Sequence, residues 1–98
     1  MKHIIKVNVI VVPNCIACEV VQNVIKEAIE NNNLNVNLKV TECTDKIKKD
    51  YNIQSYPTTI FSKYDEENDM YKEICRLNAS FSVEYFNNII DKIKLENG

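Results

Sequence analysis

Glycine is almost missing from this 98-residue sequence, in which the only one is Gly98. Turns must therefore be built from Asn, Asp, Ser and Pro, which favour turn conformations for their own chemical reasons. Basic residues are not concentrated anywhere, since Arg76 is the only arginine and the formal net charge is −2. Without a basic block, or aromatic residues interleaved with arginines, we expect no nucleic-acid partner.

Long apolar runs are also missing. None approaches the roughly 20 residues that a membrane-spanning helix needs, so we expect no membrane association. Lys6 and Asn8 interrupt the N-terminal apolar run, and no small-residue cleavage site of a signal peptide follows it. We therefore expect a cytoplasmic protein. There, the four cysteines indicate reactive thiols rather than a framework of structural disulfides.

The length predicts a single domain that spans residues 1–98. About 45% of the residues are hydrophobic, which is enough to bury a core without disulfide or metal staples. We expect a monomer.

The pattern of apolar residues predicts an alternation of strands and helices. β-Branched residues from 4 to 12 indicate a central strand covered on both faces. The run from Cys15 has helical spacing and should end in the asparagines 31–33, where Asn tolerates the left-handed cap that Gly usually takes. The later elements are a strand over 35–40, a short helix capped by Thr44, strands over 58–62 and 70–75 joined by an acidic turn at 65–69, and a final helix capped by Ser82. The predicted order is β-α-β-α-β-β-α, an α/β chain.

Cys15 and Cys18 stand three positions apart, after the first predicted strand and at the start of the first predicted helix. Free N–H groups and the positive end of the helix dipole stabilise a thiolate there, and positions i and i+3 on a helix are neighbours. This placement favours a redox dithiol. The alternative is half of a zinc site, which needs two more ligands, but Cys43, Cys75 and His3 do not occur as a pair. We therefore predict no metal site.

This order of elements, with Cys15-Ile16-Ala17-Cys18 after the first strand and Tyr56-Pro57 before the third, resembles the thioredoxin superfamily, in particular its small thioredoxin-like and glutaredoxin-like members. The stretch 50–58 is similar to a conserved thioredoxin segment, with Asn52 in place of a glycine. The resemblance implies a thioredoxin-like fold of βαβ-α-ββα order, with helices flanking a four-stranded mixed sheet of strand order 2-1-3-4. It also implies a cis bond before Pro57.

The same resemblance implies roles for the site residues. Cys15 would be the nucleophile and Cys18 the resolving thiol, and the two would form a redox disulfide. Tyr56 and Pro57 would bind the substrate as an added strand. Thiol–disulfide exchange needs no cofactor. The partners implied are disulfide-containing protein substrates and a disulfide reductase that donates electrons.

Several positions depart from the family pattern. Val9 occupies the place of a buried aspartate that assists the resolving thiol, and Asn14 replaces an aromatic residue. The glycine-rich stretch with which glutaredoxins bind glutathione is missing near Ala79, which disfavours a glutathione-dependent role. Glu19 follows the dithiol directly, and a nearby carboxylate disfavours the thiolate. We therefore predict that the pKa of Cys15 lies in the upper part of the roughly 3.5–7.5 window and that the protein is a reductant.

We therefore predict a thiol–disulfide oxidoreductase that reduces protein disulfides. Two other functions stay open on the sequence. One is a redox-inactive thioredoxin-fold module that binds proteins, and the other is a metal or iron–sulfur carrier in which the dithiols of two chains share an ion or cluster. We interpret Cys43 and Cys75 as small half-buried hydrophobic residues near the dithiol edge of the sheet. Three strand spacings of about 4.8 Å should keep them from forming a disulfide. Arg76 either orients an anionic substrate group or is a surface charge.

Overall fold

The computed structural model describes residues 4–95 and shows the predicted order of elements. The strands are β1 (Ile5–Val11), β2 (Val36–Glu42), β3 (Thr58–Asp65) and β4 (Met70–Leu77). The helices are α1 (Ile16–Asn32), α2 (Asp45–Asp50) and α3 (Val83–Leu95). His3, weighed above as a metal ligand, lies outside the described residues.

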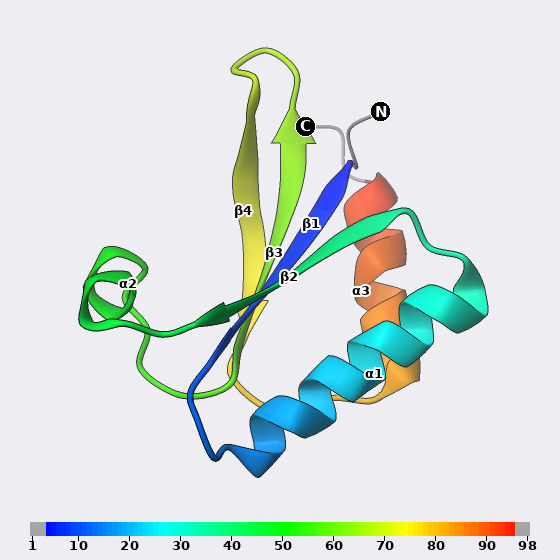
Figure 1. Cartoon of the computed structure of the whole chain (residues 1–98). Helices are drawn as coiled ribbons and strands as arrows, with labels where there is room; N and C mark the ends of the chain where they lie inside the picture. Colours follow the sequence, from blue (N-terminus) through cyan, green and yellow to red (C-terminus); the bar gives the residue numbers. More distant parts are fainter. Residues whose placement is uncertain (1–3, 96–98) are drawn as a thin grey trace.

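The strands form a four-stranded sheet of order β2-β1-β3-β4, as the resemblance implied. β1 pairs in parallel with β2 and antiparallel with β3, which continues antiparallel into β4. Helices α1 and α3 lie together on one face of the sheet, and α2 lies beyond the other (Figure 1). This mixed α/β arrangement is a thioredoxin-like fold.

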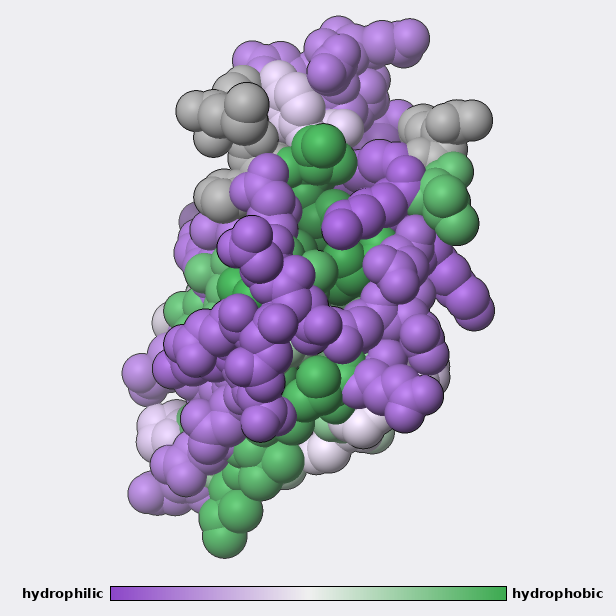
Figure 2. Space-filling model, turned by 90° about the vertical axis from the view of Figure 1, so that its right-hand side faces the viewer, coloured by the Kyte–Doolittle hydropathy of each residue, from purple (hydrophilic) through white to green (hydrophobic). Residues whose placement is uncertain are grey.

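The main hydrophobic core lies between the sheet and the helices α1 and α3. Alternate residues of β1 point into it, and they meet inward-facing residues of both helices. Phe61 and Phe86 are fully buried there, with ring centroids 5.7 Å apart. The outer side of this helical layer is mainly hydrophilic, with hydrophobic groups gathered in narrower bands (Figure 2).

The opposite face of the sheet is covered only in part. Ile10 packs there with Ile53 and Ile60, next to Ile47 of α2. Further along β1, the half-buried Lys6 places its ammonium group 5.6 Å from the ring centroid of Tyr71. The expectation that β1 is covered on both faces is therefore wrong for its first half, because α2 is only six residues long and reaches only one end of the strand.

Asparagine and aspartate take the positions where glycine is common. All non-glycine residues with a positive φ in the described chain are of these two types, namely Asn14, Asn33, Asn52 and Asp69. Asn33 caps α1 with φ 48° and ψ 47°, as the sequence predicted. Asn and Asp tolerate this left-handed region because their short polar side chains bond locally to the backbone.

Candidate redox site

The dithiol lies at the N-terminus of α1. Cys15 is the N-cap residue, with an extended backbone, and the helix proper begins at Ile16. The Sγ of Cys15 accepts a hydrogen bond from the backbone N–H of Cys18 at 3.1 Å. The two cysteines form a disulfide bond, with their Cα atoms 5.2 Å apart. A sulfur at this place receives the donors that a helix start leaves unsatisfied.

The two sulfurs differ in exposure. Cys15 is half-buried, whereas only 2% of Cys18 is exposed. Cys18 belongs to the inward stripe of α1, which continues through Val21 and Ile25, so the helical period itself buries it. Ile16, on the outer side of the same turn, is 80% exposed. One sulfur can therefore be reached by a substrate, and the other is held beneath it.

The sheet register brings the predicted docking residues to the edge of the sheet where the dithiol lies. Ile10, near the end of β1, pairs with Thr58 at the start of β3. Pro57 immediately precedes Thr58, is buried, and follows a cis peptide bond from Tyr56. The side chain of Thr58 holds this loop by donating to the carbonyl of Ser55 at 2.7 Å. Tyr56-Pro57 and the loop that leads to Cys15 thus leave the sheet at the same edge.

Tyr56 makes a contact that the sequence did not indicate. Its hydroxyl group donates a hydrogen bond to the Sγ of Cys43 at 3.4 Å. This bond, together with partial burial, raises the pKa of Tyr56 above its usual 10.0, because both stabilise the neutral phenol. Cys43 and Tyr56 pack against the small cluster of Ile10, Ile53 and Ile60.

Cys75 occupies a different environment from Cys43. It is half-buried against the main core beneath α1 and α3, whereas Cys43 lies on the other face of the sheet. β2 and β4 are also the two outer strands. No disulfide joins these two cysteines, in agreement with the strand spacing.

Arg76 is committed to contacts within the protein. Its guanidinium group donates two hydrogen bonds to the carboxylate of Glu73, both at 2.7 Å, and a third to the carbonyl of Tyr51 at 2.8 Å. Tyr51 caps the C-terminus of α2. The side chain therefore ties the end of α2 to β4. This role differs both from orienting an anionic substrate group and from being a simple surface charge.

A small cavity of 260 Å³ adjoins the dithiol. It is lined by residues from the end of β1, the loop after it, the first turns of α1 and the end of β2: Val11, Val12, Pro13, Asn14, Cys15, Cys18, Glu19, Gln22 and Glu42. Glu42 was not among the residues expected at the site. The alternation of β2 puts it on the same face of the sheet as Val36 and Leu38, but only the pairing of Glu42 with Val11 of β1 brings it next to the dithiol.

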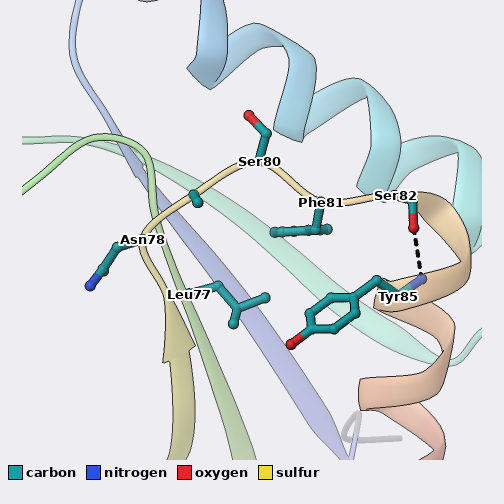
Figure 3. Close-up of a pocket in the computed structure, with 7 residues that line it drawn as sticks. Leu77, Asn78, Ser80, Phe81, Ser82 and Tyr85 are labelled. Atoms are coloured by element: carbon teal, nitrogen blue, oxygen red, sulfur yellow. Dashed lines mark hydrogen bonds between the residues drawn. The ribbon is translucent and has the colours of Figure 1, made fainter.

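A second cavity of 390 Å³ lies beyond the end of β4, against the first turn of α3. Leu77, Phe81 and Tyr85 offer their side chains to it, while Asn78 and Ser80 point away from these three (Figure 3). The hydroxyl of Ser82 caps α3 by accepting from the backbone N–H of Tyr85 at 3.0 Å, as the sequence predicted. The wall of this hollow is thus formed mainly by apolar and aromatic side chains.

Residues 4–95 contain no group of three or more His, Cys, Asp or Glu side chains placed to hold a metal ion. None of the helices in that range is both long and apolar enough to cross a bilayer.

The fold and the placement of the dithiol define a thioredoxin-like protein. A family model described as thioredoxin domain matches residues 5–67, which is more than half of the chain, and the chain belongs to this family. No curated protein matches it in sequence.

Solved structures show the same fold at low sequence identity. Thioredoxin-2 of the malaria parasite, described as a component of its protein secretion machinery, has a TM-score of 0.77 at 17% identity, over 94% of this chain and 85% of that one. Chloroplastic thioredoxin z has a TM-score of 0.77 at 14% identity, over 97% and 82%. Thioredoxin of Trichomonas vaginalis has a TM-score of 0.73 at 15% identity, over 91% and 78%.

Proposed function

We propose that this protein is a thiol–disulfide oxidoreductase that reduces disulfide bonds in other proteins. The observation that carries the proposal is the pairing of a half-buried Cys15 at the start of α1 with a buried Cys18 joined to it. In the reduced protein, the Cys15 thiolate attacks a target disulfide and forms a mixed disulfide. Cys18 then attacks Cys15, which releases the reduced target and leaves the Cys15–Cys18 disulfide.

The geometry supports Cys15 as the attacking sulfur. It receives the N–H of Cys18 and lies at the positive end of the α1 dipole, and both favour a thiolate. Glu19 in the first turn opposes this effect, which favours a reductant over a strong oxidant.

Tyr56 and Pro57 are the proposed docking element. Pro57 has no N–H to donate, so the backbone groups of Tyr56, in the loop before β3, would be the ones that pair with an extended target segment. The apolar hollow of Leu77, Phe81 and Tyr85 lies beyond the end of the neighbouring strand and would accept an apolar side chain of the target. Disulfide-containing proteins are therefore the proposed substrates, and a disulfide reductase in a reducing compartment such as the cytoplasm is the proposed electron donor.

Insulin reduction by dithiothreitol tests the proposal. The parent protein should accelerate the precipitation of insulin, and Cys15→Ser should abolish the acceleration. Cys75→Ser is the matched control, since it removes a thiol that lies against the main core, away from the dithiol and the docking loop, and it should retain the activity. A parent protein with no activity above background would contradict the proposal and favour the protein-binding module.

Trapping identifies the substrates. Cys18→Ser should hold targets as mixed disulfides through Cys15, and reduction should release them. The double variant Cys15→Ser, Cys18→Ser should hold none. Proteins bound without a disulfide by both variants would again favour the binding module.

A further inference from the structure

The resolving step of the proposed reaction requires a proton to leave the Cys18 thiol. Burial disfavours the charged form of a thiol, so a thiol as buried as Cys18 ionises poorly without a base. The position that resembles the family's buried aspartate is Val9 in this chain, and Val9 is fully buried and apolar. Val9 cannot accept the proton, so any protein group that does so lies elsewhere around the dithiol.

Glu42 ends β2 on the face of the sheet that α1 covers. Side chains alternate along a strand, and Val36 and Leu38 of β2 both pack into the core beneath α1. Glu42 is an even number of positions from both, so its side chain is on the same face of the strand. Its neighbour Thr41 faces the other way, where its hydroxyl donates to the Oδ1 of Asn8 at 2.8 Å. Glu42 is therefore on the α1 side of the sheet, at the end of β2 where the strand leaves the core, and both it and Val40 of the same face are exposed.

The register places this carboxylate next to the dithiol. Glu42 pairs with Val11, two residues beyond Val9 on the same strand, and it lines the same 260 Å³ cavity as Cys15 and Cys18. The space is larger than the roughly 30 Å³ that a water molecule occupies, so water can connect the carboxylate to the thiol.

The cavity lining contains four titratable groups. They are the two thiols, Glu19 from α1 and Glu42 from β2, while the end of β1 and the loop after it contribute none. No lysine, arginine or histidine is among the lining residues. Glu19 follows Cys18 on the helix, so its side chain is turned by about 100° from the inward direction of Cys18. Glu42 instead reaches the cavity from the end of β2, where it is exposed to the water that fills the space.

We propose that Glu42 is the proton acceptor for Cys18. The proposal rests on the oxidoreductase function above. In the resolving step, the Cys18 Sγ forms a bond to the Cys15 Sγ, and the bond between Cys15 and the target sulfur breaks. The target sulfur leaves with the electron pair as a thiolate, and the proton of Cys18 passes through water to the carboxylate of Glu42. The dithiol is oxidised by two electrons and the target disulfide is reduced. When a reductase reduces the dithiol, Glu42 returns the proton.

Stopped-flow reaction with 5,5′-dithiobis(2-nitrobenzoate) separates the two steps. The experiment uses reduced protein with Cys43→Ala and Cys75→Ala, so that only the dithiol reacts. This parent should release one dye thiolate as the mixed disulfide forms on Cys15 and a second as Cys18 resolves it. Glu42→Gln should slow the second release by about 10²-fold at pH 7 and leave the first intact. Glu42→Asp should recover part of the rate.

The pH profile separates proton transfer from a structural effect. With Glu42→Gln, the proton must go to hydroxide, so the second rate should rise about tenfold for each pH unit, whereas the parent rate should change little. Glu27→Gln is the matched control, since Glu27 is an exposed carboxylate of α1 outside the cavity lining, and it should keep the parent's second phase. The proposal is overturned if Glu42→Gln keeps the parent's second rate and pH profile, or if Glu27→Gln loses both equally. A parent that releases only one dye thiolate contradicts the oxidoreductase function itself, and the proposal falls with it.

Discussion

The hydroxyl of Tyr56 donates a hydrogen bond to the Sγ of Cys43 across 3.4 Å. It links the residue before Pro57 to the residue after β2, 13 positions earlier in the chain. The proposed docking loop is therefore fastened to the sheet by a thiol outside the dithiol.

Cys43→Ala should lower the pKa of Tyr56 toward its ordinary value of 10.0, because the neutral phenol loses its acceptor. Since folding raises this pKa, the bond contributes stability below about pH 10, and the contribution is lost as pH rises through the folded-state value. NMR titration of the Tyr56 ring measures the shift. An unchanged pKa in Cys43→Ala would contradict the role of the hydrogen bond.

Arg76→Ala should raise the pKa of Glu73 toward its ordinary 4.5, since the hydrogen bonds from the guanidinium lower it in the parent. A lowered pKa means that the pair contributes stability above the unfolded-state pKa and loses it as pH falls through the folded-state value. The parent should therefore lose more stability than Arg76→Ala between about pH 6 and pH 3. Urea denaturation across that range tests this, and parallel curves would contradict it.

Asn33→Ala should destabilise the protein by about 1 kcal/mol, because alanine tolerates the left-handed C-cap of α1 poorly. Asn33→Gly should match or exceed the parent, since glycine has no Cβ to clash. The midpoint of chemical denaturation measures both variants. Equal stability of the Ala and Gly variants would show that the cap conformation does not limit the choice of residue.

Phe86→Ala should cost about 3–5 kcal/mol, the usual range for removing a buried aromatic side chain. Phe86 is fully buried, and its ring contacts Phe61 and Phe81 at centroid distances of 5.7 and 6.0 Å. Tyr85→Ala, one position earlier on α3 and half exposed, is the control and should cost under about 1 kcal/mol. Denaturant unfolding compares the two, and similar losses would place the core elsewhere.

Local chemistry made much of the fold predictable. The period of the apolar residues set the order of strands and helices, and asparagine at 33 marked the end of α1 because few other residues accept a left-handed cap. The strand ends were less accurate. β3 and β4 run on to Asp65 and Leu77, because pairing between two strands continues past the point where the apolar pattern stops.

The tetrapeptide from Cys15 to Cys18 was also sufficient to place the dithiol at a helix start. The difference in exposure between its two sulfurs follows from the helical period, which was visible in the sequence. The prediction that both faces of β1 are covered was wrong. The length of α2 and the part of the second face that it covers depend on where the chain turns in space.

The sequence by itself determined the residues that carry the chemistry and the elements that hold them, because both depend on spacing within a few residues. The tertiary structure alone decided which distant residues meet. Glu42 lines the cavity of the dithiol because β2 pairs in parallel with β1, and Cys43 receives the hydroxyl of Tyr56 because the chain returns to the same edge before β3. Such contacts depend on sheet register, which no local pattern encodes.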